Sequence, residues 1–170
     1  MSDQNTLLFN SLALLSTTKN YADISISELT KNAGVSRMYF YRHYQTFDDI
    51  ITAHINDIFS RFLQLIGRQP TKSTSAITRS FFEAFAPDLE AFVIFLNNGQ
   101  GALIQRTFEQ DLTDLLQTEL LPFPRQNDAY WQSYVSGGLS RVLVVWFEDA
   151  QRDSPKVMGE RIAAIVDPQK

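Results

Sequence analysis

The sequence predicts an all-α protein in which an N-terminal unit of three short helices is joined by one long helix to a C-terminal helical bundle. Three observations lead to this fold class. Apolar residues recur at helical spacing along most of the 170 residues. A glycine at position 34 separates two short helical patterns, and one uninterrupted helical pattern runs over 47–67. We therefore expect two units, residues 1–46 and residues 47–170.

Composition limits the class of protein. Thirteen phenylalanines favour a packed aromatic core. The absence of cysteine excludes disulfides and thiolate metal sites, and it fits a reducing compartment. Residues 1–20 lack the basic start of a signal peptide, and no apolar run is long enough to span a membrane. We expect a cytoplasmic protein without a membrane segment.

The first helix is expected over 5–19. Asn5 or Thr6 is suited to cap its start, and Asn20 is expected to end it in the left-handed conformation. Its apolar positions follow a period near 3.6 and are Leu7, Leu8, Leu12 and Leu15.

Two short helices are expected in 25–44. Ser25 and Glu28 form a capping-box pattern at the start of the first, and Gly34 is suited to the left-handed turn that ends it. Ser36 is placed to cap the second helix. Two short helices joined by a tight glycine turn predict a helix-turn-helix, whose second helix enters the DNA major groove.

The second of these helices has two distinct faces. Phe40 and Tyr44 are four residues apart and share an inward face. The side chains expected to point the other way are Met38, Tyr39, Tyr41 and Arg42.

Residues 7–51 resemble the N-terminal domain of the TetR/AcrR family of bacterial transcriptional regulators. The residues that carry the resemblance are 26–36 (ISELTKNAGVS), 40–44 (FYRHY) and 48–51 (DDII). The resemblance implies a set of DNA contacts by matching position. Arg37, Met38 and Tyr39 are expected to meet base edges, Ser25, Ser36, Tyr41 and His43 are expected to meet phosphates, Arg42 is suited to either, and Ser27 completes the set.

Three positions depart from the family pattern. The family usually has a small residue at position 38, often threonine at 39 and lysine at 47, where this chain has Met38, Tyr39 and Phe47. Because that lysine usually contacts phosphate, its replacement weakens the part of DNA affinity that does not depend on sequence. An alternative therefore stays open, in which the chain is a TetR-like coactivator that acts through a protein partner.

The charge distribution favours site-specific binding. The net charge is −4, which argues against a protein that coats DNA. Residues 1–68 hold six Lys/Arg and six Asp/Glu and are therefore neutral, so the net charge of −4 comes entirely from residues 69–170. Residues 31–45 carry Lys31, Arg37, Arg42 and His43 and no acid. A local basic patch on an acidic protein suits a site-specific binder.

The long helix is expected over 47–67, with Thr46 as its cap, and the polar stretch 69–75 follows it. In the family this helix joins the DNA-reading domain to the ligand domain. His54 is expected to be a surface or packing residue, because nothing nearby offers a second metal ligand. Further helices are expected over 76–86, 87–97 with Pro87 in its first turn, 102–120, 127–150 capped by Asn127 or Asp128, and from Ser154-Pro155 onward.

The last two helices also resemble the C-terminal region of short TetR/AcrR members, through Gly137-Gly138, Trp146 and Ser154-Pro155. Glycines inside a helix cost about 1 kcal/mol each, and close approach of another helix would offset that cost. We expect a homodimer through 127–166; the alternative is that the same side chains only close the core of one chain. They are Leu139, Leu143, Trp146, Phe147, Ile162, Ile165 and Val166.

The resemblance also implies a small ligand in the second unit, and the aromatic supply suggests an apolar or aromatic one. The expected pocket lies between 47–67 and the helices of 76–134. Arg106 is the candidate partner for an acidic ligand, although pairing with Glu109 or Gln110 at helical spacing is an alternative. The expected lining is Phe85, Phe92, Phe95, Arg106, Phe108, Tyr130 and Tyr134.

No catalytic site is expected. Both histidines, His43 and His54, precede the helices that follow residue 69, no serine has a candidate base in a recognisable order, and the Glu-x-x-His pairs of a di-metal bundle are absent. We expect neither a cofactor nor a metal. The sequence predicts a DNA-binding transcriptional regulator, a ligand-released repressor that reads a palindromic operator as a homodimer.

Overall fold

The computed structural model of the protein describes residues 3–69, 73–118, 120–121, 123 and 128–166, and this part of the chain is helical without any strand. The all-α prediction is confirmed. The elements in chain order are α1 (Asp3–Ser16), the 3-10 turn η1 (Tyr21–Asp23), α2 (Ile26–Ala33), α3 (Arg37–His43), α4 (Phe47–Gly67), α5 (Thr74–Phe85), the 3-10 turn η2 (Ala86–Asp88), α6 (Leu89–Asn97), α7 (Gly101–Leu116), α8 (Ala129–Glu148) and α9 (Pro155–Val166).

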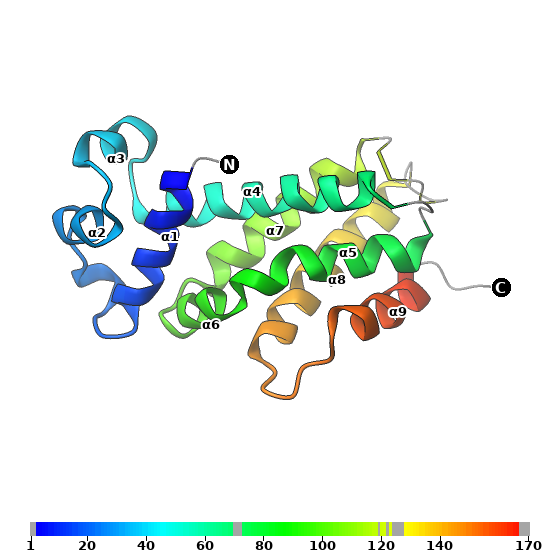
Figure 1. The fold of residues 1–170 in the computed structure, drawn as a ribbon. Helices are drawn as coiled ribbons and strands as arrows, with labels where there is room; N and C mark the ends of the chain where they lie inside the picture. The colour runs from blue at the N-terminus through cyan, green and yellow to red at the C-terminus, as the bar shows by residue number, and fades with distance from the viewer. Residues whose placement is uncertain (1–2, 70–72, 119, 122, 124–127, 167–170) are drawn as a thin grey trace.

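Helices α1–α3 gather at one end of the molecule, and α4 extends from them along its length (Figure 1). The other helices pack beside α4, with α9 lying along α5. The start of α4 is fixed by a reciprocal capping box. Thr46 Oγ1 accepts from the Asp49 amide at 3.3 Å, and Asp49 accepts from the Thr46 amide at 2.8 Å.

Two helix ends differ from the prediction. Helix α1 ends at Ser16 instead of residue 19, because the hydroxyls of Thr17 and Thr18 bind the carbonyls of Leu14 and Leu15 and compete with the helical bonds. The prediction that Asn20 is left-handed is wrong, since its backbone is extended and leads into η1.

The chain around Pro87 also differs from the prediction. Pro87 lies in η2, and α6 begins only at Leu89. The Arg61 guanidinium reaches this break and donates to the Ala84 carbonyl at 3.1 Å and to Asp88 at 3.2 Å. The capping box expected at the start of α2 is half formed. Ser25 accepts from the Glu28 amide at 3.2 Å, but the Glu28 carboxylate binds Lys19.

The core is aromatic and continuous from α1 to α8. His54 is fully buried and stacks on Phe9, with ring centroids 3.6 Å apart, so the histidine is a packing residue. Its Nε2 lies 3.0 Å from Asp88. Phe92 stacks on Phe147 at 4.9 Å.

The three N-terminal helices are bonded to the rest of the molecule. Tyr44 donates to Asn5 at 3.0 Å, and Asn5 donates to Asp57 on α4 at 2.8 Å. At the other end of α1, Asn98 donates to the Ser16 carbonyl at 3.1 Å. These bonds hold the helix-turn-helix against α4 and α6.

Candidate nucleic-acid interface and apolar cavity

Helices α2 and α3 form a tight helix-turn-helix. Gly34 ends α2 in the left-handed conformation, with φ 65° and ψ 24°. The Val35 amide then donates to the Thr30 carbonyl at 2.9 Å, which closes the turn. Ser36 caps α3 by accepting from the Tyr39 amide at 3.1 Å. The cap and the turn therefore fix where α3 points.

The orientation of α3 is held by two buried aromatic residues. Phe40 and Tyr44 are buried, and their rings lie 5.9 Å apart. Phe47 also belongs to this packing, with its ring 5.9 Å from Phe40 and 6.0 Å from Tyr21. The outer face of α3 consists of the exposed residues Arg37, Met38, Tyr41, Arg42 and His43.

Tyr39 is less exposed than these five residues. It is half-buried, and its ring lies 4.3 Å from the His43 ring and 6.3 Å from the Tyr44 ring. Ser25 and Ser27 are exposed at the start of α2, and Ser36 is exposed at the start of α3. The predicted DNA-binding residues are thus brought to the α2–α3 end of the molecule, with Tyr39 turned against its own helix.

The α2–α3 end of the molecule exposes the basic residues that the sequence places in 31–45. Lys31, Arg37 and Arg42 are exposed, and within the described part of the chain none of them forms an ion pair. Unpaired cations within a stretch that contains no acid, residues 31–45, are available to an anionic partner such as a phosphate backbone.

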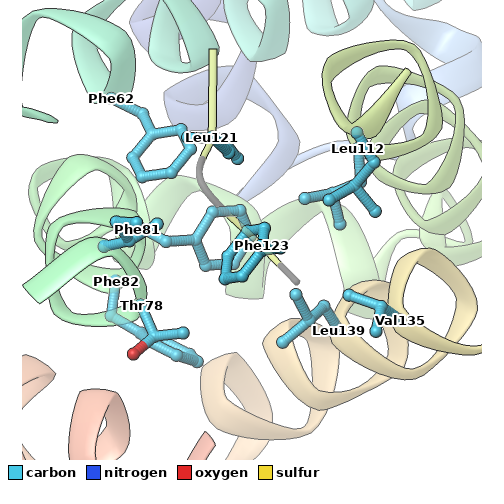
Figure 2. Close-up of a pocket in the computed structure, with 11 residues that line it drawn as sticks. Phe62, Thr78, Phe81, Phe82, Leu112, Leu121, Phe123, Val135 and Leu139 are labelled. Carbon is cyan, nitrogen blue, oxygen red and sulfur yellow. The ribbon is translucent and has the colours of Figure 1, made fainter. Parts of the chain in front are cut away.

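An apolar cavity lies between α4, α5, α7 and α8. Its volume is about 20 Å³. Figure 2 shows Phe123 among side chains from these helices. The one hydroxyl in the lining belongs to Thr78, and it already donates to the Gly159 carbonyl at 2.7 Å. The lining residues are Phe62, Ile77, Thr78, Phe81, Phe82, Leu112, Leu116, Leu121, Phe123, Val135 and Leu139.

The predicted ligand residues lie elsewhere. Phe85, Phe92, Phe95 and Phe108 are 0% exposed and pack in the aromatic core, but none of them lines the cavity. Tyr130 and Tyr134 are 90% and 65% exposed on α8, and Arg106 is exposed on α7. Of the predicted lining residues, only the four phenylalanines face inward. Helical periodicity does not tell which inward residues border a void.

A groove between α4 and α7 lies in the region where a ligand pocket is expected, but none of the residues expected to line that pocket belongs to it. Phe59 and Leu63 form its apolar wall, and the Asn56 amide donates to the Asp111 carboxylate at 2.8 Å. Burial, together with the neighbouring Asp114 carboxylate, raises the pKa of Asp111 to about 6 from its ordinary value of 3.8.

The surface of α8 and α9 carries exposed apolar residues. A groove there contains Gly138 and Ile165, and Ile165 is 56% exposed. The other groove residues are Tyr134, Val135, Leu139, Val142, Ile162 and Val166. By contrast, Leu143, Trp146 and Phe147 are buried within the single chain, so they close its core. Asp128 caps α8 through bonds from the Tyr130 and Trp131 amides, whereas the alternative cap Asn127 lies outside the described residues.

The described residues lack a metal-binding cluster and a membrane-spanning helix. No group of three or more His, Asp or Glu side chains lies close enough together to hold a metal ion. In the same part of the chain, no helix combines the length and the apolar composition needed to cross a membrane.

Comparison with known proteins identifies the fold. No protein-family model matches the sequence, and no curated protein matches it. Among solved structures, the chain is similar to the TetR family repressor AlkX from Dietzia sp. strain DQ12-45-1b, which is described as implicated in biodegradation of n-alkanes. The TM-score is 0.59 with 15% sequence identity, over 95% of each chain. At this identity the likeness concerns the fold, which is TetR-like.

Proposed function

We propose that this chain is a DNA-binding transcriptional regulator that reads a palindromic operator as a homodimer and leaves it when a small apolar ligand binds. The observation that carries the proposal is the outer face of α3, which is exposed, free of acids and held in place by Phe40 and Tyr44. The TetR-like fold supports it. In this proposal residues 1–46 are the DNA-binding domain, residues 47–170 are the ligand and dimerisation domain, and the protein is cytoplasmic and non-enzymatic.

The DNA-binding part is tested by gel shift with duplexes flanking the protein's own gene, over a salt titration. Arg37→Ala should weaken operator binding by about 1–3 kcal/mol and relax selectivity at one base pair. Tyr41→Phe, which loses only a hydroxyl suited to phosphate, should weaken binding to all duplexes alike. Arg141→Ala, an exposed arginine on α8, is the matched control. Wild-type affinity in both α3 variants would contradict the docking.

The proposal that a small apolar ligand releases the protein from DNA rests on the apolar cavity. Its lining offers no hydrogen-bonding group that is free, since the Thr78 hydroxyl is already bonded. An anionic or strongly polar ligand would lose its hydration there without compensation. The proposed ligand is therefore neutral and apolar, and Arg106, exposed on α7, has no part in binding it.

Thermal shift with a panel of neutral hydrocarbons and aromatic acids tests the ligand class. Neutral compounds should stabilise the protein and release DNA, and acids should do neither. Val135→Ile adds one methylene to the cavity wall and should weaken the stabilisation, whereas Val144→Ile makes the same change on a buried α8 position outside the lining. A hit that is unaffected by Val135→Ile would place the ligand elsewhere.

A second candidate function is a coactivator that acts through a protein partner. The observation that favours it is Phe47, which packs into the core where the family's phosphate-binding lysine would stand. A chain that shifts no duplex at low salt, but that forms a stoichiometric complex with one protein, would support this candidate over the first.

A further inference from the structure

Met38 is an exposed apolar residue on the surface proposed to bind DNA. It is the second residue of α3, and its side chain is 69% exposed. At helical spacing it shares a face with Tyr41 and Arg42, opposite the buried Phe40. Single exposed apolar residues are common on protein surfaces. Met38 is distinguished by its place. It lies in the first turn of the helix that would enter the groove, between the exposed residues Arg37 and Arg42 in the sequence.

The first turn of α3 leaves two side chains free to reach base edges. Tyr39, the third residue of the turn, is drawn back against His43, with ring centroids 4.3 Å apart. Arg37 and Met38 remain exposed. These two side chains differ in chemistry, because the guanidinium carries five donors and the thioether is only a weak acceptor.

A thioether cannot read a hydrogen-bonding pattern, so its selectivity must come from apolar contact. In the DNA major groove the apolar group that distinguishes one base pair from another is the C5-methyl of thymine. Arg37 is suited to the paired acceptors O6 and N7 of guanine. We propose that Met38 reads a thymine methyl group, so that each operator half-site holds a T·A pair next to the G·C pair contacted by Arg37. This inference rests on the proposed DNA-binding function.

Replacement of thymine by deoxyuridine tests the contact directly, because it removes the methyl group and keeps every hydrogen-bonding group of the base. Duplexes selected by the wild-type chain from a random pool are re-synthesised with one thymine at a time replaced. Wild-type affinity should fall about fourfold at one thymine of each half-site, the change expected for one buried methyl-sized group. Met38→Ala should bind the thymine and deoxyuridine duplexes equally at that position.

Two variants serve as controls. Met38→Leu keeps an apolar side chain and should retain the sensitivity to deoxyuridine. Arg37→Ala should lose discrimination at the neighbouring G·C pair and still respond to the methyl group. All three substitutions lie at exposed positions, so circular dichroism should show an unchanged fold.

The outcomes separate the two proposals. If the wild type selects no duplex at low salt, the proposed function fails, and the inference about Met38 fails with it. If the wild type binds a defined operator but Met38→Ala keeps the same pattern of deoxyuridine sensitivity, only the inference about Met38 is overturned. A Met38→Ala variant that binds DNA normally but loses a protein partner would also overturn it.

Discussion

At the scale of the residue, Gly34 and Asp111 lead to predictions about stability that can be tested without knowing the ligand or the operator. Gly34 has a positive φ of 65° in the turn between α2 and α3, and the space around its Cα is open. Asp111 is a half-buried carboxyl whose pKa is raised to about 6 by burial and by Asp114.

Gly34→Ala should destabilise the protein by about 1–2 kcal/mol in denaturant unfolding, because an alanine is strained in the left-handed conformation even where its Cβ meets no atom. Gly67→Ala is the matched control. Gly67 also has room for a Cβ but lies in α4 without a positive φ, so alanine there should be neutral or stabilising. Equal effects of the two substitutions would contradict the strain argument.

Asp111→Asn should remove a pH dependence. Folding raises the pKa of Asp111 from 3.8 to about 6, so the folded state binds more protons in this range and loses stability as pH rises through it. At pH about 7.5 the asparagine variant should be more stable by about 1 kcal/mol, after allowance for solvent screening of this half-exposed group. The difference should shrink by pH about 4. Glu160→Gln, the same charge change on the exposed side of α9, should not show this trend.

At the scale of the element, the glycines of α8 and α9 differ in how closely another helix of the same chain approaches them. Gly137 and Gly138 were expected to admit a neighbouring helix, but a Cβ on Gly138 would meet no atom of its own chain. The close crossing is at Gly159, where α9 meets α5. A Cβ there would lie 2.7 Å from Arg79 Cα.

Gly159→Ala should therefore push α9 away from α5 and break the bond from Thr78 Oγ1 to the Gly159 carbonyl. The cost should be about 1–3 kcal/mol, because the clash is with backbone atoms that cannot move aside by rotation. Gly138→Ala in α8 should instead leave the stability of the single chain unchanged or raise it by about 1 kcal/mol. Urea unfolding of both variants gives the comparison.

The sequence predicted where the helices lie along the chain better than it predicted how they pack against one another. The period near 3.6 placed the helices, and the helix-turn-helix followed from Ser36 and Gly34, because caps and left-handed turns depend on local chemistry. Helix ends at Ser16 and Leu89 were missed, since hydroxyl–carbonyl bonds and a long-range arginine decide them. The lining of the cavity depends on how helices settle against one another, which no single helical pattern contains.

At the scale of the whole molecule, the proposed dimer would bury the apolar groove on the surface of α8 and α9. A two-fold dimer would set two α3 helices against two half-sites, which is the geometry that a palindromic operator requires. Gly138 and the exposed Ile165 lie in the groove that a partner subunit would cover.

Sedimentation should therefore give about twice the chain mass of 19.4 kDa at micromolar concentration. Ile165→Glu should produce a folded monomer, because a charge would be buried in the interface. Leu14→Glu changes a similarly exposed leucine on α1 and should leave the dimer intact. A monodisperse, well-folded wild-type monomer would contradict the dimer.

The small size of the apolar cavity limits how fast the protein can respond to a ligand that binds in it. At about 20 Å³ it has room for little more than a water molecule, whereas small-molecule sites occupy about 300–1,000 Å³. Complex formation would have to wait for α4, α5, α7 and α8 to separate, so its observed rate should level off at high ligand concentration instead of rising in proportion. Stopped-flow mixing would show that plateau. A regulator with such a plateau would register a sustained supply of its ligand and ignore a brief pulse.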